Sequence, residues 1–223
     1  MKNINIKKIK GAIFDLDGTV LNSMYIWDEI GIRYLKKLGI EPDLKFKKEF
    51  KELSLRQAAE YYRNYFKIDI SMEEIINGVN KMVEGFYFDE VLKKDNVENV
   101  LELLKSNGTK MCVATATDKY LVEKALERNG ILDYFSEIYT CAIVDAGKDE
   151  AKIYDVAREH LGTPLENTVI FEDALYAIKT AKDAGYTVIG IEDVSAKEDR
   201  EEIKEICDIY VKDHFELYDL LNN

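Results

Sequence analysis

The chain has 223 residues, a formal net charge of −12 at pH 7 and a hydrophobic fraction of 47%. This hydrophobic fraction can fill a core, which disfavours intrinsic disorder, and the length fits one domain or one domain with a smaller insertion. The negative charge argues against a nucleic-acid binder and against binding to an anionic membrane surface, because both need clustered Lys and Arg. It is also a warning against any anionic small substrate.

No segment of the sequence predicts export or a membrane span. The basic N-terminus is followed by a short apolar run at 12–14 that meets Asp15, whereas a signal peptide needs roughly 7–15 apolar residues there. No apolar run approaches the roughly 20 residues of a membrane-spanning helix. The cysteines are odd in number and form no CxxC pair, so we expect buried thiols rather than disulfides. We therefore predict a cytoplasmic protein, with a monomer as the default.

Short apolar runs that alternate with helical patterns predict an α/β fold. Brief runs rich in apolar and β-branched residues are typical of strands buried on both faces of a parallel sheet, with helices packed on it. Each expected helix is followed by Gly or Asn-Gly, where helices commonly end. We expect strands at 12–14, 111–114, 168–171 and 187–191, smaller strands at 138–140 and 209–211, and helices at 97–104, 121–129, 153–160 and 174–184.

Residues 23 to about 90 follow a different pattern. The stretch has no strand-like run, and apolar residues recur at helical spacing in 27–38, 55–66 and 75–86. An all-helical block therefore interrupts the α/β pattern directly after the first strand. We predict one domain from residues 1–20 and 91–223, and an inserted helical domain from residues 21–90.

Two acidic pairs follow predicted strands. Asp15 and Asp17 end the first strand, and Glu172 and Asp173 end the strand at 168–171. Asp15 and Asp17 are two positions apart, so in an extended strand both carboxylates point to the same side. Ligands of open α/β sheets bind at the carboxyl ends of strands. Four carboxylates brought together need a cation among them, and an all-oxygen donor set favours Mg²⁺. The alternatives are solvated loop residues and an acidic helix start, and the latter is compatible with metal binding.

Two further polar residues are candidates for binding an anion. Thr115 follows the strand at 111–114, where hydroxyl and backbone N–H groups at a helix start can bind an anion, although simple helix capping explains it equally well. Lys148 belongs to no P-loop, because position 149 is Asp, and a lone lysine is more often a solvated surface residue. Neither His160 nor His214 lies at the end of a predicted strand, so we expect neither a histidine base nor a zinc site.

These elements, in this order, resemble the four motifs of the haloacid dehalogenase superfamily of phosphohydrolases over nearly the whole chain. The segment Asp15-Leu16-Asp17-Gly18-Thr19 is similar to the first motif, DxDGT. Thr115, Lys148 and the pair Glu172-Asp173 are similar to the second, third and fourth motifs. The resemblance implies a Rossmann-like parallel sheet core with an inserted all-helical cap, as in the β-phosphoglucomutase-like and phosphoglycolate-phosphatase-like branch.

The resemblance also implies a Mg²⁺-dependent phosphatase that acts on a small phosphorylated metabolite. Asp15 would attack phosphorus and form an aspartyl-phosphate, and Asp17 would act as general acid and then as general base. Mg²⁺ would be held by the Asp15 carboxylate, the Asp17 backbone carbonyl, Asp173 and Glu172. The phosphoryl oxygens would be bound by Thr115 and Lys148, with the backbone N–H groups of Leu16, Asp17 and Ala116 as further donors.

The chain departs from the family pattern at several positions. Asp149 follows Lys148 where proline is frequent, and Ala174 stands where serine is frequent. Trp27 stands where β-phosphoglucomutases carry a histidine, which disfavours mutase activity, and the presence of Asp17 disfavours dehalogenation. A phosphomutase that acts on a sugar phosphate and a non-catalytic phosphate-binding regulatory protein are the alternative functions. Candidate substrate contacts are Arg56, for which a plain surface role is equally expected, and Ser23, Trp27 and Thr117.

Overall fold

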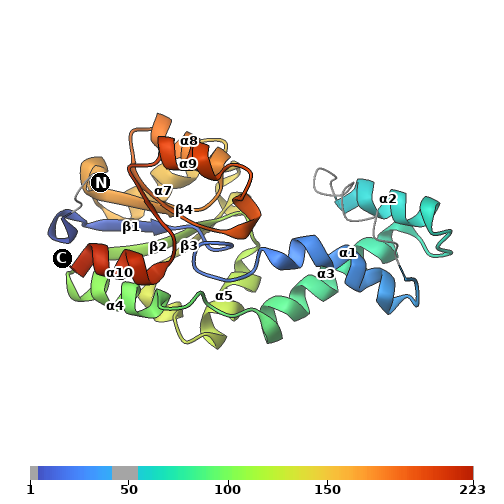
Figure 1. Cartoon of the computed structure of the whole chain (residues 1–223). Coiled ribbons are helices and arrows are strands. Elements are labelled where there is room, and N and C mark those ends of the chain that lie inside the picture. The colour runs from blue at the N-terminus through green and yellow to red at the C-terminus, as the bar shows by residue number, and fades with distance from the viewer. Residues whose placement is uncertain (1–4, 42–54, 223) are drawn as a thin grey trace. The chain divides into compact units, whose positions relative to one another are not determined.

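The computed structural model describes residues 5–41 and 55–222 (Figure 1). The chain divides into two compact units. The larger unit comprises Met1–Asn22 and Val91–Asn223, and the smaller unit comprises Ser23–Glu90.

The larger unit is built on a six-stranded sheet with the order β3-β2-β1-β4-β5-β6, in which every neighbouring pair is parallel. The chain adds strands outward from β1 to β3 and then continues on the other side of β1, so the order reverses between β1 and β4. The predicted α/β fold with a Rossmann-like parallel sheet is confirmed. The strands are β1 (Gly11–Phe14), β2 (Lys110–Thr115), β3 (Ile138–Thr140), β4 (Thr168–Glu172), β5 (Thr187–Ile191) and β6 (Ile209–Val211).

Helices cover both faces of this sheet, with α7, α8 and α9 on one face and α4 and α10 on the other (Figure 1). Covered faces explain why the strands are apolar without alternation, since all four residues of β1 are buried. The helices of this unit are α4 (Val97–Ser106), α5 (Lys119–Arg128), α6 (Cys141–Val144), α7 (Lys152–Leu161), α8 (Leu175–Asp183), α9 (Arg200–Ile206) and α10 (His214–Asn222).

The helix α7 anchors the segment that carries Lys148. Its buried residues Ile153, Ala157 and Leu161 recur every four positions and belong to one core cluster with Ile13 of β1. An apolar stripe of this spacing places one face of a helix against a sheet. Because α7 begins at Lys152, its packing holds the preceding loop, with Lys148, close to the sheet.

Helices are the regular secondary structure of the smaller unit among its described residues. They are α1 (Tyr25–Lys37), α2 (Leu55–Tyr65), α3 (Met72–Gly85) and a π-helical turn, η3 (Phe86–Glu90). The helix α3 begins at a capping box, in which Ser71 and Glu74 bond to each other's backbone N–H groups. Its buried residues Ile75, Val79 and Val83 again recur every four positions. Local capping and an apolar stripe therefore both specify this helix.

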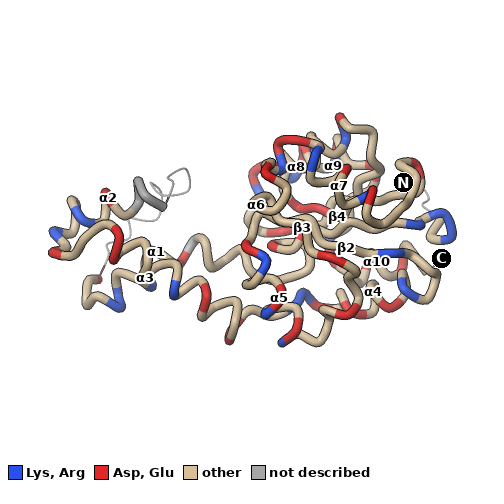
Figure 2. The backbone as a smooth tube through the Cα atoms, turned by 180° about the vertical axis from the view of Figure 1, so that it is seen from behind, with Lys and Arg blue, Asp and Glu red and all other residues tan. Residues whose placement is uncertain are grey.

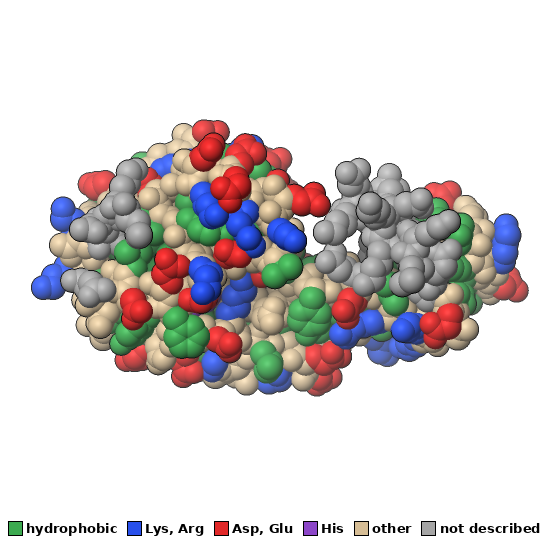
Figure 3. Space-filling view, viewed as in Figure 1, with side chains coloured by type: hydrophobic (Ala, Val, Ile, Leu, Met, Phe, Trp, Pro, Cys, Tyr) green, Lys and Arg blue, Asp and Glu red, His purple; other side chains and the backbone are tan. Residues whose placement is uncertain are grey.

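Acidic and basic residues are interspersed along both units (Figure 2) and on the face drawn in Figure 3. Several form exposed pairs within one helix, such as Lys124–Glu127 and Lys204–Glu201, and such pairs contribute little to stability. The net charge of −12 is thus spread widely, and local groups set the potential at any one site. No described helix is both long and apolar enough to cross a membrane.

His214, the first residue of α10, is buried in its neutral form. Burial, reinforced by Lys94 and opposed by Asp213, lowers the pKa of His214 from 6.5 to about 4. Its Nε2 atom is buried and has no hydrogen-bond partner among the described residues. A proton on this ring would therefore be a buried charge, which folding disfavours.

We expect His214 to lower the protein's stability as the pH falls from about 6.5 to about 4, because the unfolded chain then binds a proton at His214 that the folded chain does not. The raised pKa values of Asp15 and Asp173 act in the opposite direction over this range, so the contribution of His214 is the difference between wild type and His214→Gln. The pKa difference corresponds to at most about 3 kcal/mol of unfolding free energy. Urea unfolding at several pH values measures the loss in wild type, in His214→Gln and in the control His160→Gln, which changes the exposed second histidine. Only His214→Gln should lose less than wild type, and equal losses in all three would contradict the prediction.

Candidate active site

Asp15 lies at the carboxyl edge of the sheet, where the strand order reverses. Its backbone N–H donates to the carbonyl of Phe171 in β4 over 2.9 Å, which extends the pairing of β1 and β4 by one residue. Gly18 has a φ of 90°, which favours glycine, and its N–H donates to the carbonyl of Leu21. The N–H of Leu21 in turn donates to the carbonyl of Leu16 over 2.8 Å. The acidic segment is therefore held as a tight turn at the edge where ligands of such sheets bind.

Lys148 lies beside Asp15 and Glu172, although a lone lysine is more often solvated. It is 4% exposed, and its Nζ donates to Oδ1 of Asp15 and, over 2.6 Å, to Oε1 of Glu172. Burial alone disfavours the ammonium, but Asp15 and Glu172 outweigh it and raise the pKa of Lys148 well above its usual value. The residue is thus a permanent cation at the strand ends.

Three buried carboxylates gather around this lysine. Oxygens of Asp15, Glu172 and Asp173 all lie within 4.8 Å of one another. Burial raises the pKa of Asp15 to about 7 against the opposing effect of Lys148, and burial also raises the pKa of Asp173. One ammonium leaves two negative charges of the ionised cluster uncompensated, and a divalent cation would supply the missing charge. The all-oxygen donor set fits Mg²⁺.

The carboxylates of this cluster differ in how many partners they have. Glu172 accepts from Lys148 with one oxygen and from the backbone N–H groups of Asp173 and Ala174 with the other, over 2.7 and 2.9 Å. Asp173 accepts from the hydroxyl of Thr19 over 3.1 Å, at one oxygen. Glu172 is therefore an anchor for the lysine, and Asp173 keeps more capacity for a metal ion.

Asp17 has different surroundings from the other three acidic residues. Among the described residues, its carboxylate is not part of the metal-sized cluster, and its Oδ2 accepts the hydroxyl of Thr117 over 2.6 Å. The metal contact expected of Asp17 uses its backbone carbonyl and stays a prediction. Thr117, a candidate substrate contact from sequence, donates its hydroxyl to a predicted catalytic carboxylate, and its contact with substrate stays a prediction.

The predicted phosphate-binding groups lie at the ends of the adjacent strands β1 and β2. Thr115 is the last residue of β2 and is buried, and its hydroxyl oxygen accepts the N–H of Thr117 over 3.1 Å. The backbone N–H groups of Leu16 and Ala116 donate to no described residue. These donors fit an anion bound beside Asp15. The side chain of Arg56, another candidate, lies outside the described residues.

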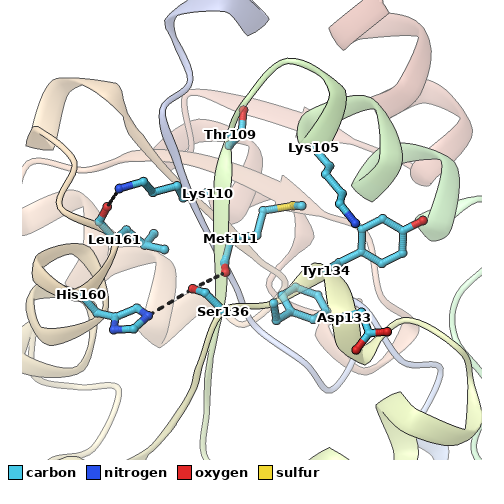
Figure 4. A pocket seen from close by; sticks show the side chains of 10 residues that line it. Lys105, Thr109, Lys110, Met111, Asp133, Tyr134, Ser136, His160 and Leu161 are labelled. Carbon is cyan, nitrogen blue, oxygen red and sulfur yellow. Dashed lines mark hydrogen bonds between the residues drawn. The ribbon is translucent and has the colours of Figure 1, made fainter.

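A cavity of about 390 Å³ lies at the opposite end of β2 and is not part of this cluster (Figure 4). Several of its polar side chains form hydrogen bonds with nearby protein atoms. Lys110 Nζ donates to the carbonyl of Leu161 over 2.8 Å, and the Ser136 hydroxyl donates to the carbonyl of Met111 over 3.0 Å. Chemistry that needs clustered carboxylates therefore belongs to the carboxyl edge of the sheet.

The family model of haloacid dehalogenase-like hydrolases matches residues 12–191. The chain belongs to this family. A relative from Clostridium perfringens, provisionally named as the pyrophosphatase PpaX, is 29% identical over 184 residues, which cover 82% of this chain and 84% of the relative. The phosphorylated carbohydrates phosphatase of Thermotoga maritima is 26% identical over 178 residues, which cover 79% of this chain and 82% of that one.

Solved structures share the fold of this haloacid dehalogenase-like hydrolase. A crystal structure from Thermotoga maritima, provisionally named as a β-phosphoglucomutase, has a TM-score of 0.83 at 22% identity and covers 96% of this chain and 97% of its own. The match to the family model confirms the family resemblance predicted from the sequence motifs.

Sequence reasoning missed two contacts of this hydrolase. The motif that contains Thr19 does not predict the hydrogen bond from its hydroxyl to Asp173, 154 positions away. The sequence also does not predict the hydrogen bond from the hydroxyl of Thr117 to Asp17. Threonines next to the strand-end motifs do indicate hydrogen bonds to the acidic residues. Which carboxylate each hydroxyl contacts depends on how two loops that are distant in sequence pack against each other.

Proposed function

We propose that this hydrolase is a Mg²⁺-dependent phosphatase that hydrolyses small phosphorylated metabolites through an aspartyl-phosphate on Asp15. The observation that carries the proposal is the buried cluster at the strand ends, in which Lys148 contacts Asp15 and Glu172 beside Asp173. Phosphatases among the named relatives support it, one of them acting by name on phosphorylated carbohydrates. We further propose that residues 21–90 form a cap that selects the substrate.

In this proposal, a carboxylate oxygen of Asp15 attacks phosphorus, the bond from phosphorus to the leaving oxygen breaks, and Asp17 gives that oxygen a proton. Asp17 then takes a proton from a water molecule, whose oxygen attacks the phosphorus of the aspartyl-phosphate. Inorganic phosphate leaves and the Asp15 carboxylate is restored. Lys148, the Thr115 hydroxyl and the N–H of Ala116 stabilise the charge that develops on the phosphoryl oxygens.

Asp15 and Asp173 would hold Mg²⁺ through carboxylate oxygens, with Glu172 beside them and the backbone carbonyl of Asp17 as a further ligand. When bound, the ion would offset the negative charge of the carboxylates and of the phosphoryl group. The protein's net charge of −12 therefore does not exclude one phosphate at this edge, because the local cations set the potential there.

A panel of sugar, nucleotide, acid and aryl phosphates with Mg²⁺ tests the proposal, with inorganic phosphate release as the readout. We expect release from at least one class and loss of release with EDTA. A coupled assay for isomer formation on sugar phosphates runs in parallel, because one structural neighbour is named as a mutase. Isomer formation without net phosphate release would favour a phosphomutase, and binding of phosphate without turnover would favour a regulatory protein.

Mg²⁺ is expected to raise the melting temperature, because a ligand that binds only the folded chain stabilises it by about 2.7 kcal/mol at a hundred times its Kd. Asp173→Asn removes one charge of the cluster and should abolish most of this shift. Asp133→Asn, which changes an exposed aspartate outside the cluster, should keep it. Calorimetry of wild type, Asp173→Asn and Asp133→Asn measures the melting temperature with Mg²⁺ and with EDTA. If Asp173→Asn kept the full shift in melting temperature, the ion would bind elsewhere.

A further inference from the structure

Thr117 lies between the end of β2 and the start of α5 at Lys119, and it touches Asp17 across 100 positions of sequence. Its backbone is held from one side, since its N–H donates to the hydroxyl oxygen of Thr115 over 3.1 Å. Its own hydroxyl donates to Oδ2 of Asp17 over 2.6 Å. A short hydrogen bond from a tethered donor fixes the direction of the acceptor group.

We propose that Thr117 is a positioning residue that sets which oxygen of Asp17 exchanges protons, an inference that rests on the proposed function. A hydroxyl has a single hydrogen, and Thr117 donates it to Oδ2 of Asp17. As long as Thr117 donates its hydrogen to Oδ2, the proton of protonated Asp17 is carried on Oδ1. Oδ1 therefore gives the proton to the leaving oxygen, and the same atom later accepts a proton from water.

The bond also restricts rotation of the carboxylate. The last side-chain torsion of an aspartate is broad, so an untethered carboxyl group presents its proton in many directions. With Oδ2 held by Thr117, the two oxygens of Asp17 have different roles throughout the reaction. Removing the hydroxyl should leave Asp17 in place but orient it for proton transfer only part of the time.

Proton transfer matters most when the leaving group is a strong base. 4-Nitrophenolate leaves readily without a proton, whereas phenolate, the anion of a weaker acid, depends more on protonation. Because kcat/KM includes every step up to formation of the aspartyl-phosphate, the loss in kcat/KM should be larger for phenyl phosphate than for 4-nitrophenyl phosphate. A general disturbance of the site would instead lower both values equally.

The experiment compares wild type, Thr117→Val, Thr117→Ser and Asp17→Asn on these two substrates with Mg²⁺. We expect Thr117→Val to lower kcat/KM about tenfold for phenyl phosphate and about twofold for 4-nitrophenyl phosphate. Asp17→Asn should show the same selectivity with larger losses. Thr117→Ser, which keeps the hydroxyl, should stay within about twofold of wild type on both, and urea unfolding checks that the variants are folded.

Equal losses on both substrates, no loss in Thr117→Val, or failure of Thr117→Ser to retain activity would each overturn the role of Thr117 while leaving the phosphatase proposal intact. Absence of phosphate release by wild type from both aryl phosphates and from the whole substrate panel would instead overturn the proposed function.

Discussion

Asp15→Asn is expected to lower phosphate release by about 10⁴-fold or more in kcat/KM, the largest effect of any single substitution in this chain. The amide has nearly the same shape as the carboxylate, but it lacks the anionic oxygen that attacks phosphorus. Lys148 keeps its contact with Glu172, so the cation stays paired and the fold should be retained. The measurement is steady-state release from the best substrate of the panel.

Two further observations make this prediction specific. Wild type mixed with substrate and quenched in acid should carry one added phosphoryl group by mass spectrometry, and Asp15→Asn should carry none. Asp133→Asn, the exposed control, should retain both the phosphoryl group and the activity. If Asp15→Asn released phosphate at more than about one hundredth of the wild-type rate, Asp15 would not be the nucleophile.

Lys148→Met is expected to lower the unfolding free energy by about 3–5 kcal/mol as well as the activity. The substitution keeps an unbranched side chain but removes the ammonium that contacts Asp15 and Glu172, which leaves buried carboxylates without a counter-charge. Lys204→Met is the matched control, because Lys204 contacts Glu201 at the surface and should change stability by less than about 1 kcal/mol. Urea unfolding of wild type, Lys148→Met and Lys204→Met measures the two stability changes, and phosphate release measures the activity.

The loss in Lys148→Met should grow as the pH rises. Burial holds the pKa of Asp15 at about 7 with Lys148 opposing the shift, so removal of the lysine raises that pKa further. Above the usual aspartate pKa of 3.8, the unfolded chain has released the proton of Asp15, whereas the folded variant still binds it. The stability of the variant therefore falls as the pH rises from this value towards the raised pKa of Asp15. A loss that is the same at about pH 5 and about pH 8 would contradict this account.

Local patterns specified most of the secondary structure. The strands at 138–140, 187–191 and 209–211 have the predicted bounds, and β1, β2 and β4 are longer than predicted by one or two residues. Strands buried on both faces need continuous apolar runs, and such runs are visible in sequence. The short helix α6 was not predicted, because four residues are too few to show a helical period.

Contacts between distant residues were less accessible. The local sequence around Lys148 predicts a solvated surface lysine, and only the family resemblance predicts that it binds phosphate. Its 4% exposure depends on α7 packing against the sheet and on two carboxylates 133 and 24 positions away. No local propensity specifies these contacts, because they require the ends of β1 and β4 and the loop between α6 and α7 to come together.

The sequence by itself determined the parallel sheet, the family and the identity of the acidic residues, since motif order and apolar runs are properties of neighbouring residues. The tertiary structure decided which hydrogen-bond partners each of those acidic residues has. Glu172 is occupied by Lys148 and two N–H groups, Asp173 keeps more capacity for a metal ion, and Asp17 is tied to Thr117. Apart from the two neighbouring N–H groups of Glu172, these hydrogen-bond partners are 24 to 154 positions apart, and they meet only once the strand ends lie side by side.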